Sequence, residues 1–160
     1  MTRGEAADPP DSGALRTPDR LRRRASRLLS QLTARSDRLI NVGLAEVDAR
    51  KWHYAVLASL ADYGPGSQAE LSGRTGIYRS DMVGVLNELG ERDLVERAPD
   101  PHDRRRNIIT ISTRGRRQLR RLDKVLDTLH DDLLAPLNPA ERDQLVQLLT
   151  RLLDHHTRTS

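Results

Sequence analysis

The sequence predicts a mainly α-helical protein that carries one small β-hairpin. Apolar residues, mostly leucines, recur three and four positions apart along most of the chain, which is the spacing of amphipathic helices. Two short apolar runs with strand character, Leu94–Arg97 and Asn107–Ile111, flank a turn signal at Asp100-Pro101. Three consecutive arginines, at positions 104–106, lie between these runs and are expected at the tip of the hairpin.

Length and composition predict one domain that shares its apolar surface with a partner chain. The 160 residues fit one domain, or one domain with an oligomerisation arm. Hydrophobic residues make up only 36% of the chain, and phenylalanine is absent. Long amphipathic helices that bury one face against a partner would resolve this shortage. The alternative is that the leucine stripes form a plain intramolecular core.

The absence of cysteine excludes disulfides and thiolate metal sites. Residues 1–17 are polar and lack the apolar core of a secretory signal, so we expect a disordered N-terminal arm. No apolar run approaches the roughly 20 residues that a membrane span needs. We therefore expect a cytoplasmic protein.

Six helical segments can be placed by their periodicity and end signals. The first runs from Pro18 to about Leu44, and the second runs from about Val47 to Tyr63. A capping box at 67–70 opens a short third helix that ends near Gly73, and a fourth follows over about 78–92. Two further helices start at Ser112 and at Asn138-Pro139, and end near positions 134 and 156.

The third and fourth helices form a helix-turn-helix. They are joined by a tight turn at Thr75-Gly76, and the predicted hairpin follows directly. This order predicts a winged helix-turn-helix over residues 47–112, with the arginines in the wing. The flanking segments 18–46 and 113–156 form the predicted helical dimerisation region.

Positive charge is concentrated around the wing. Between Asp100 and Arg121 there are eight arginines against two aspartates, a distribution typical of nucleic-acid binding. An arginine-rich tip suits the DNA minor groove, where negative potential is concentrated. The alternative is a solvated charged turn.

Three stretches together resemble the MarR family of bacterial transcriptional regulators. They are Gly-Glu-Arg-Asp-Leu-Val-Glu-Arg at 90–97, Asp-Pro-His-Asp-Arg-Arg at 100–105 and Ile-Ser-Thr-Arg-Gly at 111–115, within a resemblance that covers about residues 18–156. Asp93 replaces a family glycine, and Ile111-Ser112 stands where the family has Leu-Thr. The resemblance implies a homodimer in which the first and last two helices of each chain interlock, and a double-stranded, pseudo-palindromic DNA operator.

A recognition helix places its N-terminal half in the major groove. With Met82, Val85, Leu86 and Leu89 facing inward, the predicted DNA-facing residues are Arg79, Ser80, Asp81, Val83 and Gly84. Arg79 can bind guanine or phosphate, whereas Ser80 is either a base reader or the helix N-cap. Asp81 can accept from a cytosine or bond an arginine, and Val83 can touch a thymine methyl. Gly84 departs from the long polar or basic residue that is frequent in the family.

In the wing, we expect Asp103 to orient one arginine while another enters the minor groove. Arg104 and Arg105 align with the family signature, and Arg106 is assigned to phosphate. Gln68 and Arg74, from the first helix of the motif, are expected to contact phosphates.

Family members bind small aromatic or anionic ligands in a cleft. Here the resemblance implies Trp52, His53 and Tyr54 as cleft residues, with Arg50 or Arg38 holding a carboxylate; the alternative is that Trp52 and Tyr54 pack in the core. We expect no cofactor and no metal site, because the histidines are scattered, and the chain has no recognisable catalytic motif.

The predicted function is that of a homodimeric, sequence-specific transcriptional repressor. We expect it in the cytoplasm, associated with the nucleoid. A ligand would release it from DNA. The alternative is an architectural DNA-binding protein without an effector.

Overall fold

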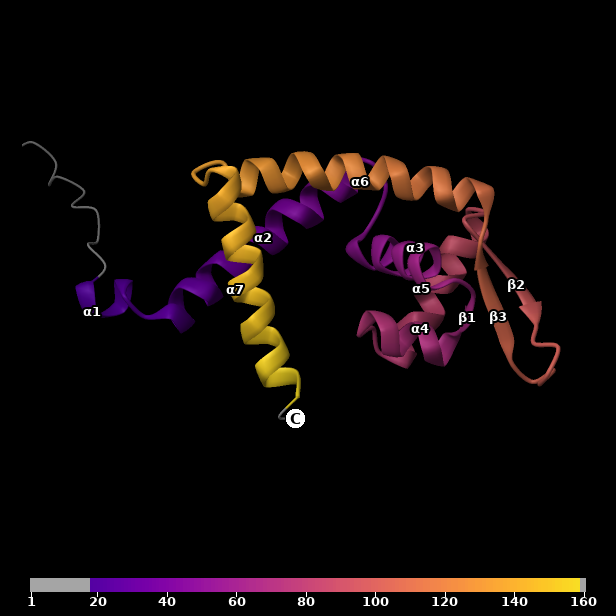
Figure 1. Cartoon of the computed structure of the whole chain (residues 1–160). Coiled ribbons are helices and arrows are strands. Elements are labelled where there is room, and N and C mark those ends of the chain that lie inside the picture. The colour runs from indigo at the N-terminus through magenta and orange to yellow at the C-terminus, as the bar shows by residue number, and fades with distance from the viewer. Residues whose placement is uncertain (1–17, 159–160) are drawn as a thin grey trace, which may run out of the picture. The chain divides into compact units, whose positions relative to one another are not determined.

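The computed structural model describes residues 18–158 and confirms the predicted fold class (Figure 1). The expected arm at 1–17 lies outside the described residues. The chain divides into two compact units after Ser36, and helix α2 runs across that boundary. The elements in chain order are α1 (Asp19–Arg22), α2 (Ala25–Ala45), α3 (Lys51–Tyr63), β1 (Gly66–Ser67), α4 (Gln68–Thr75), α5 (Arg79–Glu91), β2 (Val95–Pro99), β3 (Asn107–Ile111), α6 (Thr113–Leu133) and α7 (Pro139–Thr157).

Two predicted helix boundaries are wrong. The first predicted helix is broken after Arg22, where four arginines at positions 20 and 22–24 place like charges on adjacent turns. The second starts at Lys51 rather than near Val47. Residues 46–50 form a turn instead, in which Asp48 takes a positive φ of 54° that an aspartate tolerates better than most residues.

The sheet has three antiparallel strands in the order β1-β3-β2. The expected hairpin of β2 and β3 is present, and a third strand that was not predicted pairs with β3. In the hairpin, Val95 pairs with Ile111 and Pro99 with Asn107. The additional strand is the two-residue β1, in which Gly66 pairs with Ile109. Two residues are too few to show the alternation by which a strand is recognised in sequence.

The predicted helix caps are confirmed. Ser67 Oγ accepts a hydrogen bond from the N–H of Glu70 (3.3 Å), and the Glu70 carboxylate accepts from the N–H of Ser67 (2.6 Å). At the start of α6, Ser112 Oγ accepts from the N–H of Gly115 (2.9 Å). Asn138 and Glu141 form the same reciprocal pair as Ser67 and Glu70, with Pro139 in the first helical turn. These caps fix the starts of α4, α6 and α7.

The core lies among the C-terminal end of α2, helices α3, α4, α5 and α6, and the sheet. The four residues predicted to face inward from α5 are all at most 2% exposed. Gly115 permits the close approach of α6 to the residue that precedes β2, because a Cβ at position 115 would lie 2.0 Å from the Leu94 carbonyl oxygen. The largest fully buried side chains are Leu44, Leu57, Leu60, Leu71, Met82, Leu86, Leu89, Ile109 and Leu122.

Helix α7 differs from these helices, because none of its described residues is buried. Over residues 18–158, no helix combines the length and apolar character that a bilayer span requires.

Candidate nucleic-acid interface

The N-terminal half of α5 presents its predicted DNA-facing side to solvent. Arg79, Ser80, Asp81, Val83 and Gly84 are all exposed. The N-cap of α5 is Tyr78, which makes no side-chain cap bond, so of the two roles considered for Ser80 the helix N-cap is excluded. Ser80 lies in the first turn, where its hydroxyl remains available to a ligand of the helix N-terminus.

The turn between α4 and α5 sets where this surface begins. Gly76 ends α4 with a left-handed φ of 72°, which glycine adopts without strain, and the next residue, Ile77, is buried. Gln68 Nε2 donates a hydrogen bond to the Arg79 carbonyl oxygen (3.4 Å). Gln68 therefore lies beside the first turn of α5.

The wing tip is closed by a tight backbone turn. The N–H of Asp100 donates to the Arg106 carbonyl oxygen (2.8 Å), and the N–H of Arg106 donates to the Asp103 carbonyl oxygen (2.9 Å). The Asp100 side chain is 9% exposed and accepts from the N–H of His102 (2.9 Å). The turn therefore uses the Asp100 side chain internally, and the basic side chains that follow are exposed.

The three wing arginines differ in their partners. Asp103 Oδ1 accepts from the backbone N–H (3.1 Å) and from Nε (3.3 Å) of Arg105. The Arg106 guanidinium lies 3.9 Å from the Glu70 carboxylate on α4. Within residues 18–158, Arg104 has no hydrogen bond or ion pair, and it is exposed. Asp103 therefore holds Arg105 by two hydrogen bonds, and the entry of another arginine into the minor groove stays a prediction.

Glu70 links the wing to the helix-turn-helix. Hydrogen bonding to the backbone and side chain of Ser67, and then the positive charges of Arg106 and Arg74, lower the pKa of the Glu70 carboxyl. Arg74 itself donates to the Gly64 carbonyl oxygen (3.1 Å) and lies over the Tyr63 ring, 5.9 Å from its centre. Arg74 is exposed, so it combines a local structural contact with an accessible positive charge.

A groove of about 330 Å³ lies between the start of α4, α5 and the wing. Four arginines line it: Arg79, Arg97, Arg105 and Arg106. Arg97 is not among the DNA-binding residues predicted from the sequence; it lies on β2 and donates a hydrogen bond to Asn87 Oδ1 (2.8 Å). Arg97 pairs with Ile109 in the hairpin, which places both residues on the same face of the sheet.

Comparison with known proteins agrees with this geometry. Residues 37–106 match the model of the MarR family. The chain belongs to the MarR family of transcriptional regulators. Among its relatives is the HTH-type transcriptional repressor NicR of Pseudomonas putida, with 32% identity over 101 residues, or 63% of this chain. That match spans 64% of the length of NicR.

Solved MarR-family structures have the same fold. Bordetella bronchiseptica BpsR, whose DNA binding is regulated by 6-hydroxynicotinic acid, superimposes with a TM-score of 0.74 at 25% identity, covering 86% of this chain and 99% of BpsR. A cysteine-to-serine mutant of E. coli MarR, complexed with operator DNA, superimposes with a TM-score of 0.70 at 26% identity, covering 80% of this chain and 92% of MarR.

In this MarR-family chain, the residues predicted for a ligand cleft do not converge. Trp52 is 37% exposed and lines a groove of about 370 Å³ together with Arg50. His53 is buried and hydrogen-bonded to Glu88, in a neighbouring groove. Tyr54 is half-buried, and its hydroxyl donates to Asp123 Oδ1 (3.0 Å).

Consecutive helical residues lie about 100° apart, which explains the separation of Trp52, His53 and Tyr54. Burial, and then the hydrogen bond to Asp123, raise the pKa of Tyr54. Arg38 is exposed and lines neither groove. No group of three or more His, Asp or Glu side chains suited to a metal is found in residues 18–158.

Proposed function

We propose that this chain is a homodimeric, sequence-specific DNA-binding repressor. The observation that carries this proposal is the juxtaposition of the exposed half of α5 with the arginine-rich wing. Arg79, Ser80, Asp81, Val83 and Gly84 would read bases in the major groove. Arg104 and Arg105, oriented in part by Asp103, would enter the minor groove, while Arg106, Gln68 and Arg74 contact phosphates.

A homodimer would cover the apolar faces that remain exposed. The described part of α7 contains five large apolar residues that are at least 40% exposed, and α2 carries four more. Clustered exposed apolar residues mark interaction sites. We propose residues 18–46 and 113–156 as the dimerisation region, because obligate interfaces are apolar and often exceed roughly 2,000 Å². The α7 residues are Val146, Leu148, Leu149, Leu152 and Leu153, and the α2 residues are Leu28, Leu29, Leu32 and Val42.

A small effector would bind in the groove that Arg50 and Trp52 line. Its volume of about 370 Å³ lies within the usual range for small-molecule sites. Ala45 and Ala49 provide apolar walls, and Arg50 and Lys51 provide positive charge. A small aromatic anion fits this chemistry. Release from DNA by such a ligand, in the cytoplasm, would make the protein a ligand-controlled repressor.

The test is selection of bound duplexes from a random pool by the full chain, followed by titration of the selected duplex and of a scrambled one. We expect enrichment of an inverted repeat with half-sites about one helical turn apart. The expected preference over random DNA is roughly 10³-fold or more. Binding without enrichment would instead favour an architectural DNA-binding protein. Repeating the titration with 6-hydroxynicotinic acid and related carboxylates tests the effector proposal, and an unchanged Kd with all of them would contradict it.

A further inference from the structure

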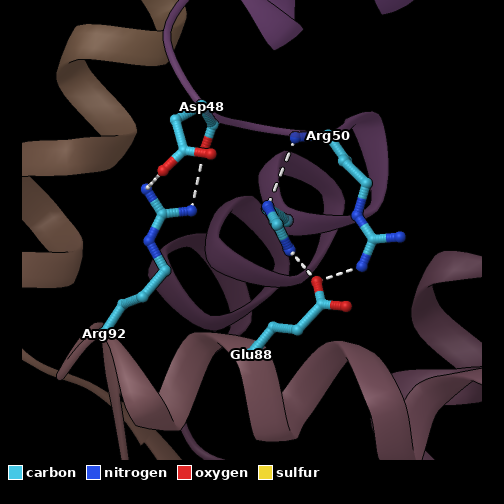
Figure 2. Close-up of polar contacts among 5 residues, drawn as sticks. Asp48, Arg50, Glu88 and Arg92 are labelled. Carbon is cyan, nitrogen blue, oxygen red and sulfur yellow. Dashed lines mark hydrogen bonds and ion pairs between the residues drawn. The ribbon is translucent and has the colours of Figure 1, made fainter.

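The proposed reading surface lies at the N-terminal end of α5. The C-terminal end of α5 makes hydrogen bonds and ion pairs with the connection between α2 and α3. Figure 2 shows the five residues involved. Two of them, Glu88 and Arg92, belong to the C-terminal part of α5 and its C-cap. The other three, Asp48, Arg50 and His53, come from the α2–α3 turn and the start of α3. We refer to these five residues as the α5 clamp.

Glu88 is held by two donors. The Arg50 guanidinium pairs with its carboxylate, and His53 Nε2 lies 2.6 Å from the same oxygen, Oε2. The other ring nitrogen of His53 accepts from the N–H of Arg50 (3.2 Å), which leaves the ring proton on Nε2 as a donor to Glu88. Hydrogen bonds from Arg50 and then from His53 lower the pKa of the Glu88 carboxyl. His53 is 5% exposed, so its ring orientation is fixed by packing as well as by these bonds.

Arg92 forms the second connection. Its Nη1 donates to the Asp48 carbonyl oxygen (2.7 Å), and its Nη2 lies 3.4 Å from Asp48 Oδ2. Asp48 is the residue with a positive φ in the turn. One arginine therefore bonds both the backbone and the side chain of that turn (Figure 2).

The charges of the α5 clamp select one position of α5 along its axis. Glu88 and Arg92 are four residues apart, so they lie on one face of the helix about one turn from each other. On the opposite side, negative Asp48 precedes positive Arg50. A displacement of α5 by one turn would place Glu88 opposite Asp48, or Arg92 opposite Arg50, and like charges repel. Neither displaced arrangement keeps an ion pair.

The same face of α5 leads to the proposed reading surface. Glu88 is four residues from Gly84 and seven from Asp81, so the three residues form one stripe along the helix. A rotation of α5 at the α5 clamp would therefore turn the reading side chains away from the bases by the same angle.

We propose that Glu88 and Arg92 are positioning residues for DNA recognition, which act by fixing the rotation and axial position of α5 against the α2–α3 turn. This inference rests on the proposed DNA-reading role of α5. The Arg50 and Glu88 side chains are 55% and 41% exposed. Because partly exposed ion pairs contribute little to overall stability, the effect of the α5 clamp should appear in sequence preference rather than in the melting temperature.

Charge reversal tests the pairing. We expect Arg50→Glu or Glu88→Arg alone to lower the preference for the selected duplex over a scrambled one about tenfold. The double variant restores opposite charges but not the acceptor for His53, so it should recover most of the preference, to within about threefold of the wild type. Glu91→Arg is the matched control, because Glu91 is an exposed glutamate of the same helix outside the α5 clamp, and its preference should remain that of the wild type.

Hydrogen exchange of the DNA-free protein provides a second readout. Backbone amides at 85–91 should exchange faster in each single variant and return to the wild-type rate in the double variant. If Arg50→Glu does not fold, Glu88→Gln replaces it, because the amide oxygen still accepts from His53 while the ion pair is lost. Folded single variants with unchanged preference and unchanged exchange would overturn the proposal, as would a double variant that is not rescued. A wild type without sequence preference would refute the proposed function instead, while the exchange rates would still test the α5 clamp.

Discussion

The two ends of α5 are built in opposite ways. At the N-terminal end, Arg79, Ser80 and Asp81 are exposed, and no hydrogen bond or ion pair of their side chains is found within residues 18–158. At the C-terminal end, Glu88 and Arg92 bond the α2–α3 turn, and the neighbouring Leu89 is fully buried. A helix that reads DNA needs available side chains at one end and a fixed orientation at the other. The difference supports the proposal that the first half of α5 recognises DNA and the second half positions the helix.

The largest expected effect comes from the wing. In Arg104→Ala/Arg105→Ala, affinity should fall about 10- to 100-fold for selected and scrambled duplexes alike, because groove and phosphate cations are lost. The slope of log K against log salt concentration should become shallower by about two, one for each arginine. Gel-shift titration over a salt series measures both quantities, with His102→Ala as a nearby control. Unchanged affinity would remove the wing from the interface.

A smaller and more selective effect is expected from Arg79→Ala. Loss of a bidentate contact with guanine should cost about 1–3 kcal/mol at one base position. Affinity for the scrambled duplex should change much less. Titration against single-base variants of the selected duplex identifies that position, whereas an equal loss on every sequence would mean that Arg79 contacts phosphate alone.

Gly84→Ala should raise the stability of the recognition helix without altering its packing. No atom lies within 4 Å of a Cβ built at this position, and alanine is favoured over glycine in helices by roughly 0.5–1 kcal/mol. Urea unfolding measures the gain. Gly84→Arg tests whether a long basic side chain in the same open space adds a DNA contact. A lower free energy of unfolding in both variants would contradict the absence of atoms around this position.

The smallest expected effect concerns pH. The pKa of Glu88 is lowered in the folded protein, so its contribution to stability is present above the ordinary glutamate pKa of about 4.3 and is lost as pH falls through the folded value. Because Glu88 is partly exposed, that contribution should be under about 1 kcal/mol. The difference in unfolding free energy between the wild type and Glu88→Gln should therefore shrink below pH 4. If the difference in unfolding free energy between the two proteins grew on acidification, the lowered pKa of Glu88 would be contradicted.

Features set by neighbouring residues could be predicted from the sequence. The capping boxes at Ser67 and Asn138, the α4–α5 turn at Gly76 and the arginine tip each depend on a few adjacent residues. The contact between His53 and Glu88 joins residues 35 positions apart, and no local pattern signals it. The separation of Trp52, His53 and Tyr54 is a different case, because the 100° spacing of consecutive helical residues already predicts that they do not share one cleft.

Site-directed cleavage of DNA tests the central claim most directly, because the chain has no cysteine of its own. An iron chelate attached through Val83→Cys on α5, or through His102→Cys in the wing, cleaves the nucleotides nearest to it, and Thr128→Cys on α6 is the control. The proposed recognition mode predicts cleavage within each half-site from position 83, cleavage in the flanking minor groove from position 102, and none from position 128. Cleavage from position 128, with none from position 83, would contradict it.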